Sequence, residues 1–161
     1  MRRILFFSTA LGLLLLVGLG PLAPQSVQDF RKASVTLVAS GYKALEADKD
    51  WDALKLFEQA VVANPRNIAA YIGLGKAHEA LGSISGGLKY YAIALELDPT
   101  HLPAWEAQVL AHLAKKEPGR AEKSLDQMLQ ICTAADCAEL IRAREALEAY
   151  QSKTVATADP S

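Results

Sequence analysis

Two stretches of this chain carry the same pattern of residues 34 positions apart. In each, a small residue is followed by an aromatic ring, then by alanine, and after a gap by proline. The matching positions are Ala53, Phe57, Ala60 and Pro65 in the first stretch and Gly87, Tyr91, Ala94 and Pro99 in the second. A 34-residue period is typical of a unit of two helices that cannot bury its own apolar face and must stack on neighbours. The period therefore predicts an all-α array of helix pairs.

The second stretch belongs to a unit that resembles the tetratricopeptide repeat (TPR). Tyr71 stands at the Trp position of that pattern, and Leu74 and Gly75 stand at its Leu-Gly. The units before and after it keep the pattern with more substitutions, as terminal repeats often do. The resemblance implies a right-handed α-solenoid of three TPR helix pairs that binds other proteins on a curved surface. The three units are 34–67, 68–101 and 102–135 within the region 26–135.

One further helix is predicted after the third unit. Asp136 and Glu139 have the spacing of a capping box, which begins a helix. The apolar positions that follow form one stripe, as a C-terminal cap helix needs to cover the last apolar face of a solenoid. We place this cap helix at 136–151. Residues 152–161 show no periodicity, and we expect a disordered tail there.

The first 25 residues read as an N-terminal hydrophobic helix, either a membrane anchor or a signal peptide. Arg2 and Arg3 precede 17 uncharged residues at 4–20. The stretch 4–23 reaches about 20 residues, enough to span a bilayer, and prolines crowd the plausible cleavage points. We favour an uncleaved anchor in a bacterial inner membrane with the repeats on the periplasmic side. The alternative is a soluble periplasmic protein after signal cleavage.

Cys132 and Cys137 are separated by four residues, between the last repeat helix and the cap helix. In an exported protein such a pair predicts a disulfide, which would hold the cap helix on the last repeat. A redox pair and a metal site are the alternatives, although the spacing is not the C-x-x-C redox motif. The region 34–150, with this turn and its cap helix, resembles a group of small proteobacterial envelope TPR proteins. That resemblance points to protein interaction.

The TPR resemblance also implies where a partner binds, because the first helix of each unit lines the concave face in that family. The partner-binding positions carried over to this chain are Val38, Tyr42, Ile72, Lys76, Glu79, Glu106 and Leu110. The two-carboxylate clamp of chaperone-binding relatives needs Lys, Asn and Arg at such places, and Lys76 is the one basic residue here. The alternative for half of the apolar positions is that they pack between repeats, since periodicity does not separate groove from core.

The sequence suggests no catalytic constellation, no metal site and no cofactor. His78 and His112 occupy equivalent repeat positions, but equivalent helices lie about 10 Å apart, and packing explains both rings better than a shared metal. The formal net charge is −1 and there is no basic stripe, so nucleic acid is not an expected partner.

We therefore expect a non-enzymatic scaffold or assembly factor that holds a peptide or helix of another envelope protein. One alternative is a thiol-active assistant in envelope protein maturation, for example of cytochrome c, working through Cys132 and Cys137. Another is a structural protein that associates with itself.

Overall fold

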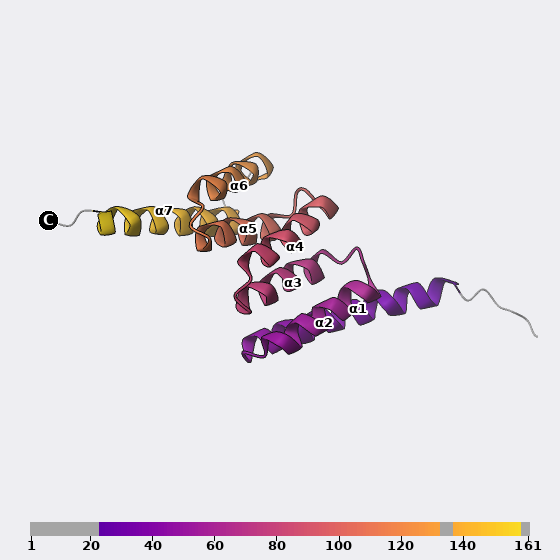
Figure 1. The fold of residues 1–161 in the computed structure, drawn as a ribbon. Coiled ribbons are helices and arrows are strands. Elements are labelled where there is room, and N and C mark those ends of the chain that lie inside the picture. Colours follow the sequence, from indigo (N-terminus) through magenta and orange to yellow (C-terminus); the bar gives the residue numbers. More distant parts are fainter. Residues whose placement is uncertain (1–22, 133–136, 159–161) are drawn as a thin grey trace, which may run out of the picture.

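The computed structural model describes residues 23–132 and 137–158, and every regular element within these ranges is an α-helix. The first six helices form three antiparallel pairs, and the seventh follows the last pair (Figure 1). The helices are α1 (Ala23–Glu46), α2 (Asp50–Ala63), α3 (Ile68–Ala80), α4 (Ile84–Leu97), α5 (Leu102–Ala114), α6 (Pro118–Ile131) and α7 (Ala138–Ala158).

The helix boundaries repeat with the 34-residue period of the sequence. The second helices of the three pairs begin at Asp50, Ile84 and Pro118, and the first helices of the last two pairs begin at Ile68 and Leu102. Helix α1 departs from this rule. The period places its start at Ser34, but it begins at Ala23 and so carries eleven additional residues at its N-terminal end.

The turns inside the three pairs also repeat. Asp48, Gly82 and Lys116 all have positive φ angles, of 55°, 82° and 59°. In each turn the next residue donates its N–H to the carbonyl five positions earlier, as Ser83 does to His78. This is the Schellman arrangement, which ends a helix by satisfying its last carbonyl groups. Glycine adopts a positive φ at little cost, and of the three turns only the middle one has a glycine, Gly82, at this position.

The packing of helices between pairs defines an inner and an outer layer. Helix α1 contacts α3, and α3 contacts α5, so the three first helices lie together. Within the described residues, the backbones of α2, α4 and α6 do not approach one another. The array is therefore tighter on the side of the first helices, which form its inner face. Helix α7 packs on α5 and α6, where a further repeat would continue, and this matches the predicted cap.

Three clusters of buried side chains hold the array together, and each one joins a helix pair to the helix that follows. Phe57 is fully buried between α1, α2 and α3, and Tyr91 fills the equivalent place one period later. Met128 lies in the third cluster, which includes residues of α7. Glycines make room for the two rings: a Cβ at Gly73 would collide with Phe57, and one at Gly75 would collide with Tyr91. The rings thus set how closely the helices approach.

The two ends of the chain differ from the predictions. Helix α7 continues to Ala158, so the expected disordered tail is wrong for residues 152–158. Both α1 and α7 project beyond the helix pairs at opposite ends of the array (Figure 1). None of the helices in the described ranges is long and apolar enough to cross a membrane. The apolar stretch predicted as an anchor lies almost wholly in residues 1–22, outside the described residues, and its last residues, 23–25, begin α1.

A candidate partner-binding groove

A cavity of about 480 Å³ opens on the inner face, where α1, α3 and α5 meet the N-terminal part of α7. The lining residues are Tyr42, Ala69, Ile72, Lys76, His101, Pro103, Glu106, Ala107, Leu110 and Arg142. We call this cavity the groove. It unites residues from all three repeats, because equivalent positions of the first helices face the same side of the array.

Five of the seven residues predicted to bind a partner line the groove. Leu110 is the most accessible apolar one, at 44% exposure, whereas Ile72 is nearly covered, at 6%. Leu110 can therefore contribute contact area to a partner, whereas Ile72 contributes more to packing between repeats. The remaining three of the five are Tyr42, Lys76 and Glu106.

The other two predicted residues lie elsewhere. Val38 is buried in the cluster around Phe57 and does not line the groove, so its partner contact stays a prediction. Glu79 does not line the groove; its side chain lies beside Gly87 and against Tyr91. Burial raises the pKa of Glu79, and the hydrogen bond with Tyr91 and the charge of Lys76 partly oppose this rise. The pKa of the Tyr91 hydroxyl is also raised, first by burial and then by the charge of Glu79.

Tyr42 and Lys76 form the basic end of the groove. The Lys76 Nζ lies 5.6 Å from the centre of the Tyr42 ring, within the range of a cation–π contact. The same ring stands edge-on to Phe57, with 5.2 Å between ring centres. Burial raises the pKa of the Tyr42 hydroxyl. Tyr42 therefore connects the groove to the core of the first repeat, and it presents only part of its ring to a partner.

An ion pair between α5 and α7 forms the opposite end. Arg142 donates from Nε to Glu106 Oε1 at 2.6 Å and from a terminal nitrogen to Oε2 at 2.7 Å, a two-bonded geometry. Glu139 lies 3.6 Å from the same guanidinium group. These carboxylates raise the pKa of Arg142, with the Glu106 hydrogen bonds as the largest cause. The pair leaves this end of the groove close to neutral and holds α7 beside it.

Sequence reasoning missed Arg142, because the cap helix has no place in the repeat pattern. The 34-residue period also points elsewhere, to Leu140, which is buried in the third cluster. Helix α7 begins 36 positions after α5, so Glu106 and Arg142 are each the fifth residue of their helix. The period alone could not predict this two-residue shift.

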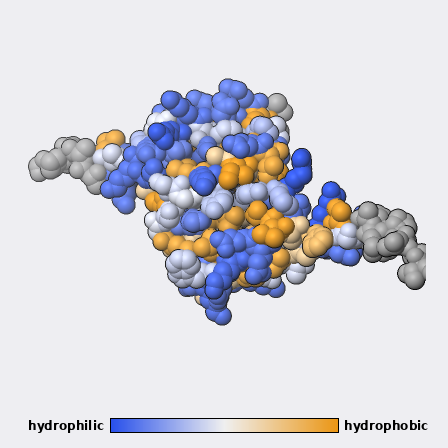
Figure 2. All heavy atoms as spheres, turned by 45° about the vertical axis from the view of Figure 1, so that its right-hand side comes forward, coloured by the Kyte–Doolittle hydropathy of each residue, from blue (hydrophilic) through white to orange (hydrophobic). Residues whose placement is uncertain are grey.

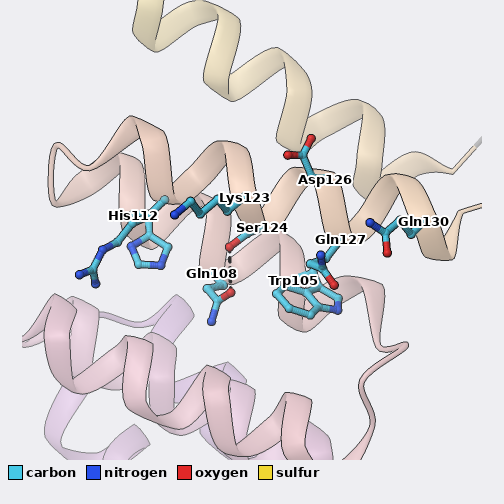
Figure 3. A pocket seen from close by; sticks show the side chains of 9 residues that line it. Trp105, Gln108, His112, Lys123, Ser124, Asp126, Gln127 and Gln130 are labelled. Carbon is cyan, nitrogen blue, oxygen red and sulfur yellow. Dashed lines mark hydrogen bonds between the residues drawn. The ribbon is translucent and has the colours of Figure 1, made fainter.

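A second cavity, of about 510 Å³, lies along α5 and α6 (Figure 3). Its residues are mostly amides and charged side chains, among them Gln108, Gln127 and Lys123. The Ser124 hydroxyl donates to Gln108 Oε1 at 2.8 Å across it. Its walls are more polar than those of the groove, and two of its polar groups already satisfy one another. The groove is the better candidate because it combines apolar side chains with a few placed charges.

The cysteine pair lies at the junction of α6 and α7. The Cα atoms of Cys132 and Cys137 are 6.3 Å apart, within the range that a disulfide bridges, and the sulfur atoms face each other. Both side chains pack on the third buried cluster. Among the described residues, no group of three or more His, Cys, Asp or Glu side chains could hold a metal ion. The disulfide stays a prediction, with an arrangement that suits it.

The surface outside the two cavities and the cysteine pair carries both apolar and polar residues. On the face turned forward in Figure 2, apolar residues gather in several patches between hydrophilic ones. Nine large hydrophobic side chains in the described part of the chain are exposed, and they lie on α1, α2, α5, α6 and α7. Single exposed apolar residues are normal on soluble proteins, so a patch needs further support before it indicates an interface.

Comparison with models of known protein families finds no match. A search of curated proteins finds Superkiller protein 3 of Saccharomyces cerevisiae, 28% identical over 95 residues. That match covers 59% of this chain and only 6% of the yeast protein. The chain therefore corresponds to a small part of that relative.

Solved structures resemble this chain over most of its length. The first TPR domain of Spaghetti (RPAP3), bound to the HSP90 peptide SRMEEVD, has a TM-score of 0.66 and 17% identity, covering 78% of this chain and 95% of its own. The Yersinia enterocolitica type III secretion chaperone SycD, in complex with a peptide of the translocator YopD, has a TM-score of 0.63 and 22% identity. It covers 74% of this chain and 93% of its own. At these identities the likeness concerns the arrangement of the helices.

Proposed function

We propose that this chain, which has the fold of a tetratricopeptide-repeat array, is a non-enzymatic adaptor that holds a peptide or helix of another protein in its groove. The observation that carries the proposal is the convergence of Tyr42, Lys76, Glu106 and Leu110 from three helices on one cavity. The two similar domains were solved with peptides bound, a peptide of HSP90 in one case and of YopD in the other. This supports the same mode of recognition here.

The groove differs from one built to clamp the C-terminal carboxylate of a peptide. Lys76 is the one basic side chain that the first helices contribute, and it stacks on Tyr42. The second cation, Arg142, is already held by Glu106. We infer that the partner contributes mainly an apolar segment that contacts Leu110 and the exposed part of the Tyr42 ring, with polar contacts at the two ends of the groove.

We further propose that the adaptor acts in the bacterial cell envelope, anchored in the inner membrane by residues 4–23 with the repeats on the periplasmic side. The support is the 17-residue uncharged stretch behind two arginines. The cysteine arrangement fits an oxidising compartment. N-terminal sequencing of protein from isolated membranes tests this. A mature chain that begins near Ser26 excludes the anchor and leaves the soluble periplasmic alternative.

The groove can be tested by photo-crosslinking in living cells. A benzophenone amino acid at position 110 is expected to give a discrete adduct with a partner, and Lys76→Glu is expected to reduce it. Both sites are exposed, and because Lys76 also lies near Tyr42 and Glu79, circular dichroism checks that the variant keeps its helices. The matched controls are the crosslinker at position 89 and Lys89→Glu, on the exposed side of α4. Equal adducts at positions 110 and 89 would show that the partner uses another surface.

A thiol-active role is the second candidate, favoured by the facing sulfur atoms of Cys132 and Cys137. A redox role requires a pair that mild dithiol reductants open readily, whereas a structural disulfide resists them. Replacement of both cysteines by serine separates the two. An adaptor keeps its position-110 adduct in the double variant, and a thiol-active protein loses its activity in the cell.

A further inference from the structure

We propose that the end of the array formed by α1 and α2 rests directly on the lipid bilayer. This surface, which we call the N-terminal apolar face, consists of Val27, Phe30 and Val62 together with Ala33 and Ala63. It is separate from the groove. The proposal rests on membrane anchoring by residues 4–23, and it goes beyond anchoring because it fixes which part of the folded array touches lipid.

The face exists because α1 is longer than its partner helix. Ser34 is buried against the end of α2: its hydroxyl donates to the carbonyl of Ala60 at 2.8 Å and accepts from Asn67 Nδ2 at 2.7 Å. Helix α2 ends soon after, at Ala63, where Phe30 and Ala33 of α1 still share a cavity with it. The part of α1 before Phe30 extends beyond the end of the pair (Figure 1).

The side chains on this overhang are apolar where a partner would normally cover them. Val27 and Phe30 continue the helical stripe that is buried from Ser34 onward, but they are 53% and 59% exposed. Val62, near the end of α2, is 82% exposed. An apolar cavity of about 530 Å³ lies between the two helices, lined by Phe30, Ala33, Val62, Ala63 and the stems of longer polar residues.

The chain immediately before α1 indicates what covers this face. Residues 4–20 carry no charge, and α1 begins only three residues later, at Ala23. A helix rises about 1.5 Å per residue, so Phe30 lies about 10 Å along α1 from its start. The headgroup layer on each side of a bilayer is roughly 5–8 Å deep. If the preceding segment spans the membrane, Val27 falls within that layer, and the Phe30 backbone lies a few ångströms beyond it with its ring leaning back toward the N-terminus of α1.

The charges near the face suit a lipid surface. Arg31 and Lys32 follow Phe30 on α1, and Lys55 lines the cavity from α2, against the acidic Asp29 and Glu58. All five are exposed, and long basic side chains reach phosphate groups while their stems cover apolar surface. A bilayer accepts both the apolar residues and the small basic excess.

The test uses the full chain reconstituted in vesicles of phosphatidylethanolamine and phosphatidylglycerol. A benzophenone amino acid replaces Phe30, and the matched control carries it at Trp51, an exposed aromatic residue at the opposite end of the α1–α2 pair. We expect lipid adducts at position 30 in about tenfold excess over position 51, since interfacial residues contact acyl chains and headgroups. Position 62 should behave like position 30.

Every other outcome overturns the proposal in a recognisable way. An adduct between two chains at position 30 means that a second copy covers the face, and an adduct with residues 4–20 of the same chain means that this segment folds back on it. Equal lipid labelling at positions 30 and 51 in a chain that resists carbonate extraction means that the anchor holds without this contact. Loss of the chain from the vesicles on extraction refutes the anchoring itself. None of these results affects the position-110 crosslink, which tests the groove.

Discussion

Replacing Gly82 by alanine isolates the energy of one backbone conformation. Gly82 ends α3 with a φ of 82°, and a Cβ built on it meets no atom within 4 Å. The substitution therefore adds no steric contact with the rest of the protein. Its whole effect on the native state comes from placing an L-residue in the left-handed region.

The expected size follows from two opposing terms. The left-handed conformation costs a residue with a Cβ about 1–2 kcal/mol. Alanine also restricts the unfolded chain relative to glycine, which returns about 0.4–1 kcal/mol. The net loss in the free energy of unfolding is about 1 kcal/mol for Gly82→Ala. For a chain of this size that corresponds to a fall of about 4 °C in the midpoint of thermal unfolding.

The same chemical change at Gly119 provides the control. Gly119 lies in the first turn of α6, where a Cβ also meets nothing within 4 Å, and Gly82 is the one glycine with positive φ in the described residues. Gly119→Ala is expected to raise the free energy of unfolding by about 0.5 kcal/mol, because only the unfolded-state term remains. Urea unfolding followed by circular dichroism at 222 nm measures both. Shifts of the two midpoints in the same direction would refute the reasoning.

The third turn allows the converse experiment. Lys116 holds a φ of 59° at the position equivalent to Gly82. Lys116→Gly should therefore stabilise the array by about 1 kcal/mol, the difference between the left-handed cost and the extra freedom of glycine in the unfolded chain. Lys116→Ala removes the charge and keeps the strain, so it is expected to leave the urea midpoint unchanged.

Three further outcomes are expected. Tyr91→Ala empties the centre of the second buried cluster and should lower the free energy of unfolding by about 3–5 kcal/mol in urea titrations, while Tyr91→Phe should cost far less. Mass spectrometry of freshly isolated protein without reductant should show Cys132 and Cys137 both blocked, and Cys132→Ser should cost roughly 2 kcal/mol; two free thiols would contradict the disulfide. The raised pKa of Glu79 means that its carboxyl group binds a proton more tightly in the native state than in the unfolded chain. The protonated group therefore stabilises the native state below its ordinary pKa of 4.5. This contribution is lost as the pH rises through the native pKa. Glu79→Gln should flatten the fall in urea midpoint between acidic and neutral pH, and an unchanged profile would exclude Glu79 as its source.

The repeat pattern predicted the inner face well, because the period fixes which side of each helix faces its neighbours. Tyr42, Lys76 and Leu110 meet in one cavity for that reason. Val38 illustrates the limit of the method: it lies on a first helix like the others, but it packs into the buried cluster that α1 forms with α2 and α3. A pattern of apolar positions indicates which side of a helix is buried. It does not indicate how much of that side the neighbouring helices cover.

The ends of the array were predicted less well, because no period operates there. The N-terminal extension of α1 has no counterpart in the other units, and the alignment with them placed the first unit's start at Ser34. The end of α7 carries Thr154 and Val155, whose branched side chains disfavour helix. The helix nevertheless continues, and the Ser152 and Thr154 hydroxyls bond to carbonyls four positions earlier along it. Hydrogen bonds of this kind, from a side chain to the backbone, cannot be predicted from the local amino-acid composition alone.

The separation of the outer helices gives the array a preferred direction of bending. The first helices already touch, so further closure of the groove compresses packed side chains, whose interiors have low compressibility. Opening the groove instead moves α2, α4 and α6, whose backbones do not approach one another in the described structure, closer together. We therefore expect the array to resist tightening more than straightening. A bulky partner should lengthen it on binding, and small-angle scattering would record this as an increase in the radius of gyration per chain.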